Sequence, residues 1–372
     1  MMKKLAAFVL VFALCFALLA IGHTGSSRPA APAASPAAAE ESTRYSTMFL
    51  DTFDTVISLI GYAESEEAFS QQAAAVHETY LYLHRLYDNY NHYDGIVNVY
   101  DLNERAAEAP VAVDPALFGL LTFAKSHYEL AHGQTNVAMG SVLRIWHEYR
   151  EAGLDDPENA QLPPQDQLIA ASEHVSIDDL VLDPDAQTVY FADPLLKLDV
   201  GAVAKGYATE IVAKMLFESG MPSFCISAGG NVRVGLPPLD GRKAWGVGIQ
   251  DPDGAVFGTS DIVEALYLSD LSVVTSGDYQ RFYEVDGVRL HHLIDPDTLA
   301  PGAFYRSVSI ITEDSGYADF LSTAAFLMPY DESRAFIEGL EGVEAIWLFD
   351  DGGMEMTDGA KPYARSFGAT NQ

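Results

Sequence analysis

The segment LDVGAVAKGYATE, residues 198–210, decides the fold around it. An apolar stretch ends at Asp199. It is followed by a tight turn that Gly201 and Gly206 flank. A helix is expected over residues 206–219, with Gly220 as its cap. This pattern predicts a strand that ends at Asp199, a turn, and a helix whose apolar stripe comprises Ile211, Val212, Met215 and Leu216.

The same turn is a candidate phosphate site. A turn that enters a helix presents backbone N–H groups and the positive end of the helix dipole, which together favour an anion. Lys205 adds a mobile cation. Read alone, the turn could equally be an ordinary connection between a strand and a helix, because short motifs of this kind are common.

The rest of the chain mixes helical and strand patterns without regular alternation. Helices are expected at residues 65–90, 115–132 and 318–328, and a surface loop at 155–167. Strands are expected at residues 54–60, 180–182, 188–191, 223–226, 245–249, 271–275 and 345–349. Because these elements do not alternate as in a doubly wound sheet, the sequence predicts an α+β fold of mixed sheets with packed helices.

Composition limits the partners of this chain. Its 372 residues are 49% hydrophobic, and 21 Lys+Arg face 53 Asp+Glu, a net charge of −32. Such a surface repels nucleic acid, so no nucleic-acid partner is expected. A polyanionic substrate would need a metal ion or a few well-placed cations. The acidity can also be a solubility or salt adaptation of the whole surface.

The N-terminus indicates export. Lys3 and Lys4 precede an apolar run, so residues 1–22 are predicted to be a signal peptide or an N-terminal membrane anchor. Residues 23–42 are rich in Ala, Pro and Ser and are expected to form a linker, which leaves residues 43–372 as one globular domain. Cys15 follows Leu14, where a lipoprotein signal would have a small residue. Cys225 alone cannot form a disulfide within the folded part.

Three further segments can carry chemistry: SAGGNVRVG (227–235), TSGDYQRF (275–282) with HHLIDPDTLAP (291–301), and YADFLSTAAF (317–326). In the first, two glycines allow close backbone approach, although a plain hairpin explains them equally well. In the second, adjacent histidines point to opposite faces of a strand, so only one is expected to face a site. His291, His292 and Asp295 could also suggest zinc, but their spacing fits no common zinc pattern.

The last segment is a candidate magnesium site. Asp319 and Thr323 are four residues apart, so on a helix they share a face. A carboxylate and a hydroxyl are hard oxygen ligands of the kind that magnesium prefers. A helix cap and a solvated Thr would explain the same pair without a metal.

Together and in this order, the four segments resemble the FAD:protein FMN transferase family, called ApbE. The resemblance runs from about Met48 to Met328 and includes NHYDGIVNVYDLN at 91–103 and GQTNVAMGSVLRIW at 133–146. It implies an ApbE-like, T-fold-related architecture. It also implies a magnesium-dependent enzyme that takes FAD as substrate and transfers FMN to a Thr or Ser hydroxyl of an exported flavoprotein, releasing AMP.

The resemblance also assigns roles to individual residues. Magnesium would be held by the backbone carbonyl of Ala202 and the side chains of Asp319 and Thr323. His292 would assist proton transfer, and Lys205 would act on the phosphates. Contacts with FAD are implied for Phe53, Thr135, Asn136, Val137, Asp199, Lys205 and Leu293.

The chain departs from the family pattern at three places. Phe53 stands where the family has a Met that touches the flavin, Asn136-Val137-Ala138 replaces an Asp-Pro-Thr segment, and Leu299 replaces a Gly. No implied metal ligand is lost, so these departures affect contacts with the flavin ring.

Three other functions remain open from the sequence. An FAD pyrophosphatase would use water in place of the acceptor hydroxyl, and a periplasmic flavin-binding protein would hold FAD without reacting. The pair of Asp319 and Thr323 argues against simple storage, which needs no metal. The tail Ser366-Phe367-Gly368-Ala369-Thr370 faintly resembles a flavin-acceptor sequence, so self-modification is the third possibility.

Overall fold

The computed structural model describes residues 42–254 and 262–372. The predicted leader and nearly all of the predicted linker lie outside these residues. Within the described part, no helix is both long enough and apolar enough to cross a membrane.

The centre of the protein is an eight-stranded sheet in the order β1-β2-β6-β7-β10-β13-β14-β15. Every neighbouring pair in it is antiparallel. Its strands are β1 (Thr43–Thr52), β2 (Thr55–Ala63), β6 (Phe224–Ala228), β7 (Asn231–Val234), β10 (Leu271–Gly277), β13 (Ser307–Thr312), β14 (Glu344–Leu348) and β15 (Met354–Met356).

Both faces of this sheet are buried, and the side chains alternate between two cores. Along β2, Ile57 and Leu59 belong to the larger core, whereas Ile60 and Tyr62 belong to a second core on the other face. This division follows from the two-residue period of a strand. The second core is closed by a hairpin of β8 (Trp245–Gln250) and β9 (Ile262–Leu268), and by the C-terminal segment through Ala360 and Ala364.

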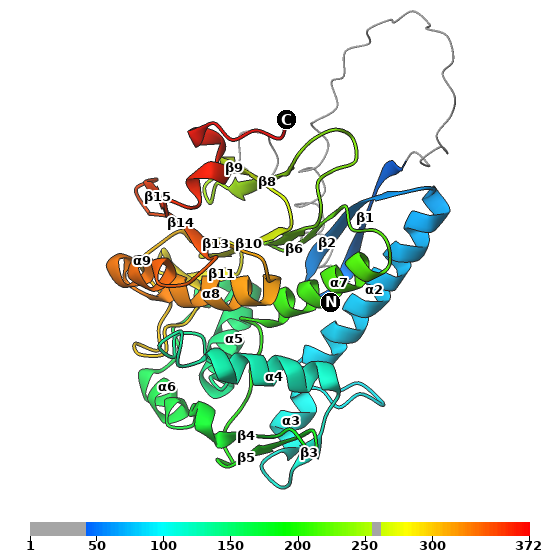
Figure 1. The fold of residues 1–372 in the computed structure, drawn as a ribbon. Coiled ribbons are helices and arrows are strands. Elements are labelled where there is room, and N and C mark those ends of the chain that lie inside the picture. The colour runs from blue at the N-terminus through cyan, green and yellow to red at the C-terminus, as the bar shows by residue number, and fades with distance from the viewer. Residues whose placement is uncertain (1–41, 255–261) are drawn as a thin grey trace, which may run out of the picture.

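Helices cover the face of the sheet on which the larger core lies (Figure 1). The two that matter most for function are α7 (Ala204–Glu218) and α8 (Ser315–Leu327), which pack against each other and against the sheet. Asp314 caps α8 by accepting a hydrogen bond from the Tyr317 N–H. The other helices are α2 (Glu66–Tyr87), α3 (Val99–Arg105), α4 (Pro115–His127), α5 (Gly140–Asp155), α6 (Gln165–Ser172) and α9 (Tyr330–Glu338).

A further layer lies on the far side of α7 and α8 from the sheet (Figure 1). It contains α3 to α6 and a small antiparallel sheet of β3 (Val111–Ala112), β5 (Thr188–Phe191) and β4 (Leu180–Asp183). A separate hairpin of β11 (Phe282–Val285) and β12 (Val288–His291) packs on α5. Short 3-10 turns occur at Pro157–Asn159, Ile177–Asp179, Lys361–Tyr363 and Arg365–Phe367.

Helices and antiparallel strands are thus mixed, which confirms the α+β prediction. Several predicted boundaries are wrong. Asp199 does not end a strand, because Lys197 makes only an isolated bridge with Met139. The predicted helix over 115–132 stops at His127, and His132 and Gly133 then adopt positive φ angles that end helical structure. The predicted loop over 155–167 contains a 3-10 turn and the start of α6.

The helix predicted over 206–219 begins at Ala204 and ends at Glu218. Lys205 and Gly206 therefore lie in its first turn rather than in the connection before it. Glycine disfavours a helix by about 1 kcal/mol, which is why the sequence places the boundary after Gly206. The close packing of α7 on α8 requires a glycine there and outweighs that preference.

Candidate active site

A cavity of about 700 Å³ opens where the large sheet, the layer of α7 and α8, and the layer of α5 meet. It brings together segments that are far apart in the sequence. The predicted site residues on its wall are Phe53, Thr135, Asn136, Asp199, Ala202, Lys205, His292, Leu293, Asp319 and Thr323. Val137 is the one predicted residue that does not line it.

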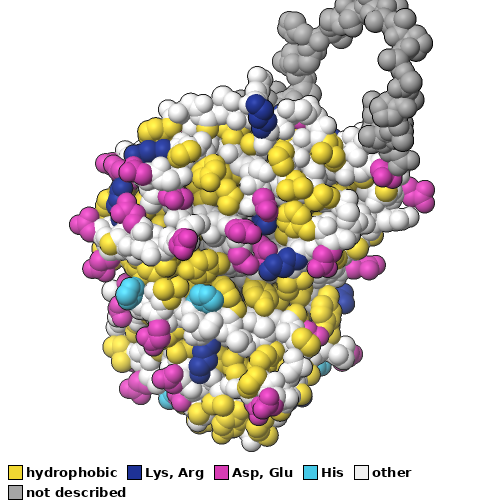
Figure 2. Space-filling model, viewed as in Figure 1, with side chains coloured by type: hydrophobic (Ala, Val, Ile, Leu, Met, Phe, Trp, Pro, Cys, Tyr) yellow, Lys and Arg dark blue, Asp and Glu magenta, His cyan; other side chains and the backbone are white. Residues whose placement is uncertain are grey.

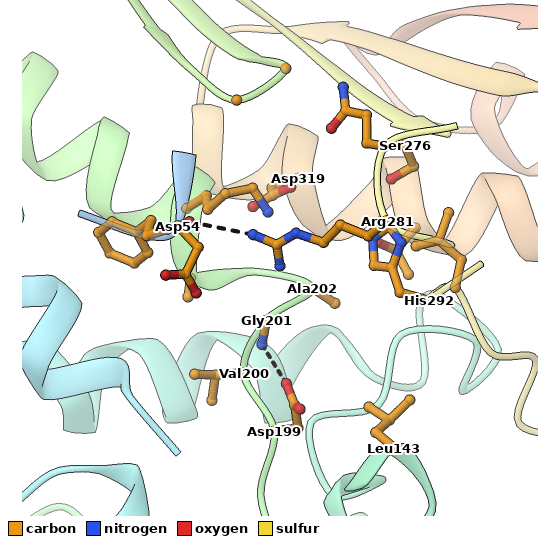
Figure 3. Close-up of a pocket in the computed structure, with 18 of the residues that line it drawn as sticks. Asp54, Leu143, Asp199, Val200, Gly201, Ala202, Ser276, Arg281, His292 and Asp319 are labelled. Carbon is orange, nitrogen blue, oxygen red and sulfur yellow. Dashed lines mark hydrogen bonds between the residues drawn. The ribbon is translucent and has the colours of Figure 1, made fainter. Parts of the chain in front are cut away.

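The upper wall is built around Asp319 of α8 (Figure 3). Its side chain is 5% exposed, and Oδ2 accepts a hydrogen bond of 2.8 Å from the Gly206 N–H of α7. Burial raises the pKa of Asp319, while Lys205 and the Gly206 N–H oppose that rise. For Lys205, burial has the opposite effect and lowers the pKa, and the charge of Asp319 offsets part of that lowering. A buried acid and a buried base thus face a cavity that can admit a charged ligand.

These residues fit a magnesium ion chemically. Asp319 offers a carboxylate, Thr323 one helical turn later offers a hydroxyl, and Ala202 offers a backbone carbonyl, all on the cavity wall. Hard oxygen donors of this kind suit magnesium, which also takes substrate phosphates as ligands. The described residues contain no cluster of three or more His, Cys, Asp or Glu side chains that could hold a metal.

Asp199 is fixed at the lower wall by two hydrogen bonds. Oδ1 accepts from the Gly201 N–H at 2.8 Å, and Oδ2 accepts from Asn89 Nδ2 at 3.1 Å. In Figure 3, Asp199 and Asp319 lie on opposite sides of the Arg281 side chain, with Ala202 between them.

The predicted flavin-side segment, Thr135 to Val137, is held in place by hydrogen bonds to neighbouring parts of the protein. Thr135 Oγ1 donates to the Phe320 carbonyl of α8 at 2.9 Å, and Asn136 Nδ2 donates to the Val175 carbonyl. Val137 is buried, and its carbonyl accepts the Asp199 N–H at 2.9 Å. Any effect of Val137 on a ligand is therefore exerted through its backbone and Asp199.

Phe53 sits in the tight turn between β1 and β2 at the cavity rim. Phe53 and Asp54 both have positive φ angles, 53° and 49°, which are uncommon for such residues. The turn is secured by His84 Nδ1, which accepts the Phe53 N–H, and by Arg281, which donates to the Phe53 carbonyl. The aromatic ring thus has a fixed position at the rim, where the family pattern has a Met.

The two adjacent histidines face different surroundings, as predicted. His291 Nε2 donates to the Gly302 carbonyl at 2.7 Å and Nδ1 accepts the Leu293 N–H, so both ring nitrogens are engaged. His292 lines the cavity, and its buried Nδ1 has no hydrogen-bond partner. Asp295 accepts the backbone N–H groups of its own turn. These roles leave no shared zinc site for the three residues.

Burial also governs the protonation of His292. It lowers the pKa well below the usual value, and the nearby cations Arg281 and Lys205 lower it further. The imidazole is therefore neutral at pH 7 and can accept a proton.

Sequence reasoning missed two arginines on the cavity wall, Arg150 and Arg281. Arg281 lies within a quoted motif, TSGDYQRF, but was given no role. Arg150 lies on α5, which was not predicted as a helix. A helical period was present in the sequence, because Leu143, His147 and Arg150 are four and three residues apart. That spacing would have predicted that the three side chains share one face of a helix.

The cavity differs in charge from the rest of the molecule. Asp and Glu side chains are scattered over the face shown in Figure 2, in keeping with the net charge of −32. The cavity wall instead carries Lys205, Arg150 and Arg281 beside four aspartates. An anionic ligand is thus more compatible with the cavity than with the surface around it.

Known proteins share both the sequence pattern and the fold. The sequence model of the ApbE family matches residues 53–347. The FAD:protein FMN transferase of Treponema pallidum is 36% identical over 263 residues, which cover 67% of this chain and 70% of the relative. The FAD:protein FMN transferase of Klebsiella pneumoniae is 29% identical over 251 residues, 67% of this chain and 74% of that protein.

Solved structures agree with this comparison. The crystal structure of the ApbE protein from Thermotoga maritima superposes with a TM-score of 0.75 at 26% identity, covering 86% of this chain and 99% of that one. The flavin transferase ApbE from Vibrio cholerae has the same fold, with a TM-score of 0.71 at 21% identity over 87% and 99% of the two chains. By the extent of the family match and the identity to its relatives, this chain belongs to the ApbE family.

Proposed function

We propose that this protein transfers FMN from FAD to a protein. The family supports the reaction, since its curated relatives are FAD:protein FMN transferases. The observation that carries the proposal for this chain is that Asp319, Thr323, Ala202 and Lys205 all line one cavity. They supply the kinds of oxygen donor and the cation that a pyrophosphate with magnesium would need.

The chemical step is a phosphoryl transfer onto a Thr or Ser hydroxyl of the acceptor. The hydroxyl oxygen bonds to the phosphorus on the FMN side, the bond from that phosphorus to the bridging oxygen breaks, and AMP leaves with the electron pair. The hydroxyl proton passes to a base. His292 is the proposed acceptor of that proton, because its ring lines the cavity and its Nδ1 has no hydrogen-bond partner among the described residues.

Asp319, Thr323 and the Ala202 carbonyl are the proposed magnesium ligands. When bound, magnesium would neutralise charge on the phosphates during transfer. Lys205 contributes a further positive charge, and Gly206 fixes the Asp319 carboxylate through its N–H. Asp199, held by Asn89 and Gly201 on the cavity wall, is a proposed contact with FAD.

The export signal and linker of residues 1–42 support a location outside the cytoplasm, in the periplasm or another extracytoplasmic space. If the leader is retained, it would anchor the enzyme to the outer face of the membrane. The linker would then allow it to reach exported or membrane-bound acceptors. Whether the mature N-terminus starts after residue 22 decides between a cleaved signal peptide and a retained anchor.

Self-modification of the tail within one molecule is disfavoured by its position. Ser366 N–H donates to Glu264 of β9, and Ala364 lies in the core on the far face of the large sheet. The cavity is instead lined by residues of α7 and α8, among them Lys205 and Asp319. The C-terminal tail would have to detach from Glu264 and from the second core to reach Lys205.

The experiment combines purified enzyme, FAD and magnesium with and without a candidate acceptor. We expect AMP release to require the acceptor and to match the amount of FMN attached to it, measured by intact mass. Equal AMP release without the acceptor, accompanied by free FMN, would instead establish an FAD pyrophosphatase. Binding of FAD without AMP release in either mixture would establish a storage protein.

A further inference from the structure

Arg150 is a cation on the cavity wall to which the proposed reaction gives no role. It lies on α5 together with Leu143 and His147, and all three line the cavity. In Figure 3, Leu143 marks the α5 side of the cavity, on the opposite side from Asp319 of α8. Arg150 is thus part of the α5 wall of the cavity.

Among the described residues, no carboxylate is closely paired with the guanidinium of Arg150. Its side chain is 17% exposed, and the nearest acid, Glu151, is 3.9 Å from Nε and itself 53% exposed. Other buried arginines in the described chain are paired more tightly. Arg233 is 2.8 Å from Asp270, and Arg306 is 3.0 Å from Asp278. Arg150 is thus mostly buried, faces an open cavity, and is poorly neutralised by the protein.

His147 fixes the position of that guanidinium. Arg150 Nη2 donates to His147 Nδ1 at 2.7 Å. Burial and the adjacent Arg150 lower the pKa of His147, so the imidazole stays neutral and its Nδ1 remains an acceptor. The ring of His147 is held in turn by Tyr90, whose ring centre is 4.5 Å away.

The electrostatic surroundings favour an anion at this place. Burial lowers the pKa of Arg150 and the nearby Arg281 lowers it further, while Tyr90, Glu151 and Asp199 partly offset this. Two arginines that repel each other across a cavity are both stabilised when an anion lies between them. A guanidinium is suited to phosphate oxygens because its planar donors can form two parallel hydrogen bonds.

We propose that Arg150, positioned by His147, donates hydrogen bonds to a phosphoryl oxygen of FAD from the α5 wall. The ligand class is a phosphate ester, and FAD offers one phosphate on its FMN side and one on its AMP side. This inference rests on the proposed function, because it assumes that the pyrophosphate of FAD occupies the cavity.

The test measures ligand binding directly, by calorimetry with FAD, FMN, AMP, riboflavin and adenosine. The variants are Arg150→Gln and Arg150→Lys, with Arg144→Gln as the matched control. Arg144 lies on the same helix, is 66% exposed, and pairs with Glu148 at 3.0 Å. We expect Arg150→Gln to weaken FAD binding by about 10- to 100-fold, the range for losing a hydrogen bond to a charged group. Arg150→Lys should fall between, and the control should bind as wild type.

The product ligands identify the phosphate. A loss confined to FMN assigns Arg150 to the FMN-side phosphate, and a loss confined to AMP assigns it to the other. Riboflavin and adenosine lack phosphate, so their binding should be unchanged. His147→Leu should weaken the same phosphate ligand, and His147→Gln, which can still accept a hydrogen bond, should restore part of the loss.

Two outcomes would overturn the proposal. In the first, Arg150→Gln binds FAD, FMN and AMP as wild type does. In the second, it loses affinity for riboflavin and adenosine to the same extent as for the phosphate ligands, which would show a merely structural role. Failure of the wild-type protein to bind FAD at all would instead overturn the proposed function itself.

Discussion

Replacing Gly206 by Ala should disable the site by moving α8 away from α7. A Cβ at Gly206 would lie 2.3 Å from the Ser315 carbonyl, 2.4 Å from Asp319 Cβ and 2.9 Å from Asn231 Nδ2. Contacts below 3.0 Å are essentially never seen for real Cβ atoms. The first of these neighbours is backbone, so the two helices must separate before the methyl group fits.

The size of the effect follows from two opposing terms. Alanine favours a helix over glycine by about 1 kcal/mol. Overpacking a dense interior costs about 1–3 kcal/mol, and contacts with backbone belong to the upper part of that range. We therefore expect the free energy of unfolding to fall by about 1–2 kcal/mol. Because Gly206 N–H holds Asp319, a shift of about 1 Å should also lower FMN transfer by about 100-fold.

The assay combines urea unfolding with the rate of AMP release in the presence of acceptor. Gly246→Ala is the matched control, because a Cβ at that exposed position in β8 would meet Tyr267 at an ordinary 3.5 Å. We expect the control to keep wild-type stability and rate. Wild-type transfer by Gly206→Ala, together with unchanged or greater stability, would refute the idea that close helix contact sets the position of Asp319.

Three further predictions concern ligand, charge and pH. FAD at 100 times its dissociation constant should raise the free energy of unfolding by about 2.7 kcal/mol; equal thermal protection by FMN at matched concentration would count against a pyrophosphate site. Lys205→Ala should raise the KM for FAD by about 10- to 100-fold without lowering the melting temperature. The control Lys214→Ala, on the exposed side of α7, should leave the KM for FAD unchanged. A wild-type KM for Lys205→Ala would show that Lys205 does not act in the site. Burial lowers the pKa of His147, His291 and His292 below 6.5, so in acid the unfolded chain binds protons before the folded chain does. Stability should therefore fall as pH drops below 6.5, and His292→Asn should reduce that slope; an unchanged slope would show that His292 is not held neutral.

The sequence was most informative where chemistry and local period coincide. Asp319 and Thr323 were predicted to share a helix face from their spacing, and both line the cavity on α8. The strand patterns at residues 180–182, 188–191 and 245–249 correspond to β4, β5 and β8. These features depend on residues close in sequence, which is why they could be read without coordinates.

What could not be read depends on contacts between distant segments. The N–H of Gly206 is used by Asp319, 113 residues away, and nothing in the turn itself announces that partner. The wall formed by α5 was missed because GQTNVAMGSVLRIW was read as a flavin-side segment and not as the start of a helix. The burial of Arg150 and His292, which lowers the pKa of both groups, likewise arises only from tertiary packing.

The most direct test of the central claim is FMN transfer across a magnesium series, followed by the intact mass of the acceptor. The account predicts that wild type needs magnesium, that Asp319→Ala and Asp319→Asn lose most transfer, and that excess magnesium rescues Asn better than Ala, since Asn keeps one oxygen. Thr323→Val should be milder, because a neutral hydroxyl contributes less to a hard cation than a carboxylate. Asp358→Asn, at an exposed carboxylate, is the control and should transfer as wild type. Full transfer by wild type in chelator, or wild-type activity of Asp319→Ala, would contradict the proposed metal site and the role of Ala202 with it.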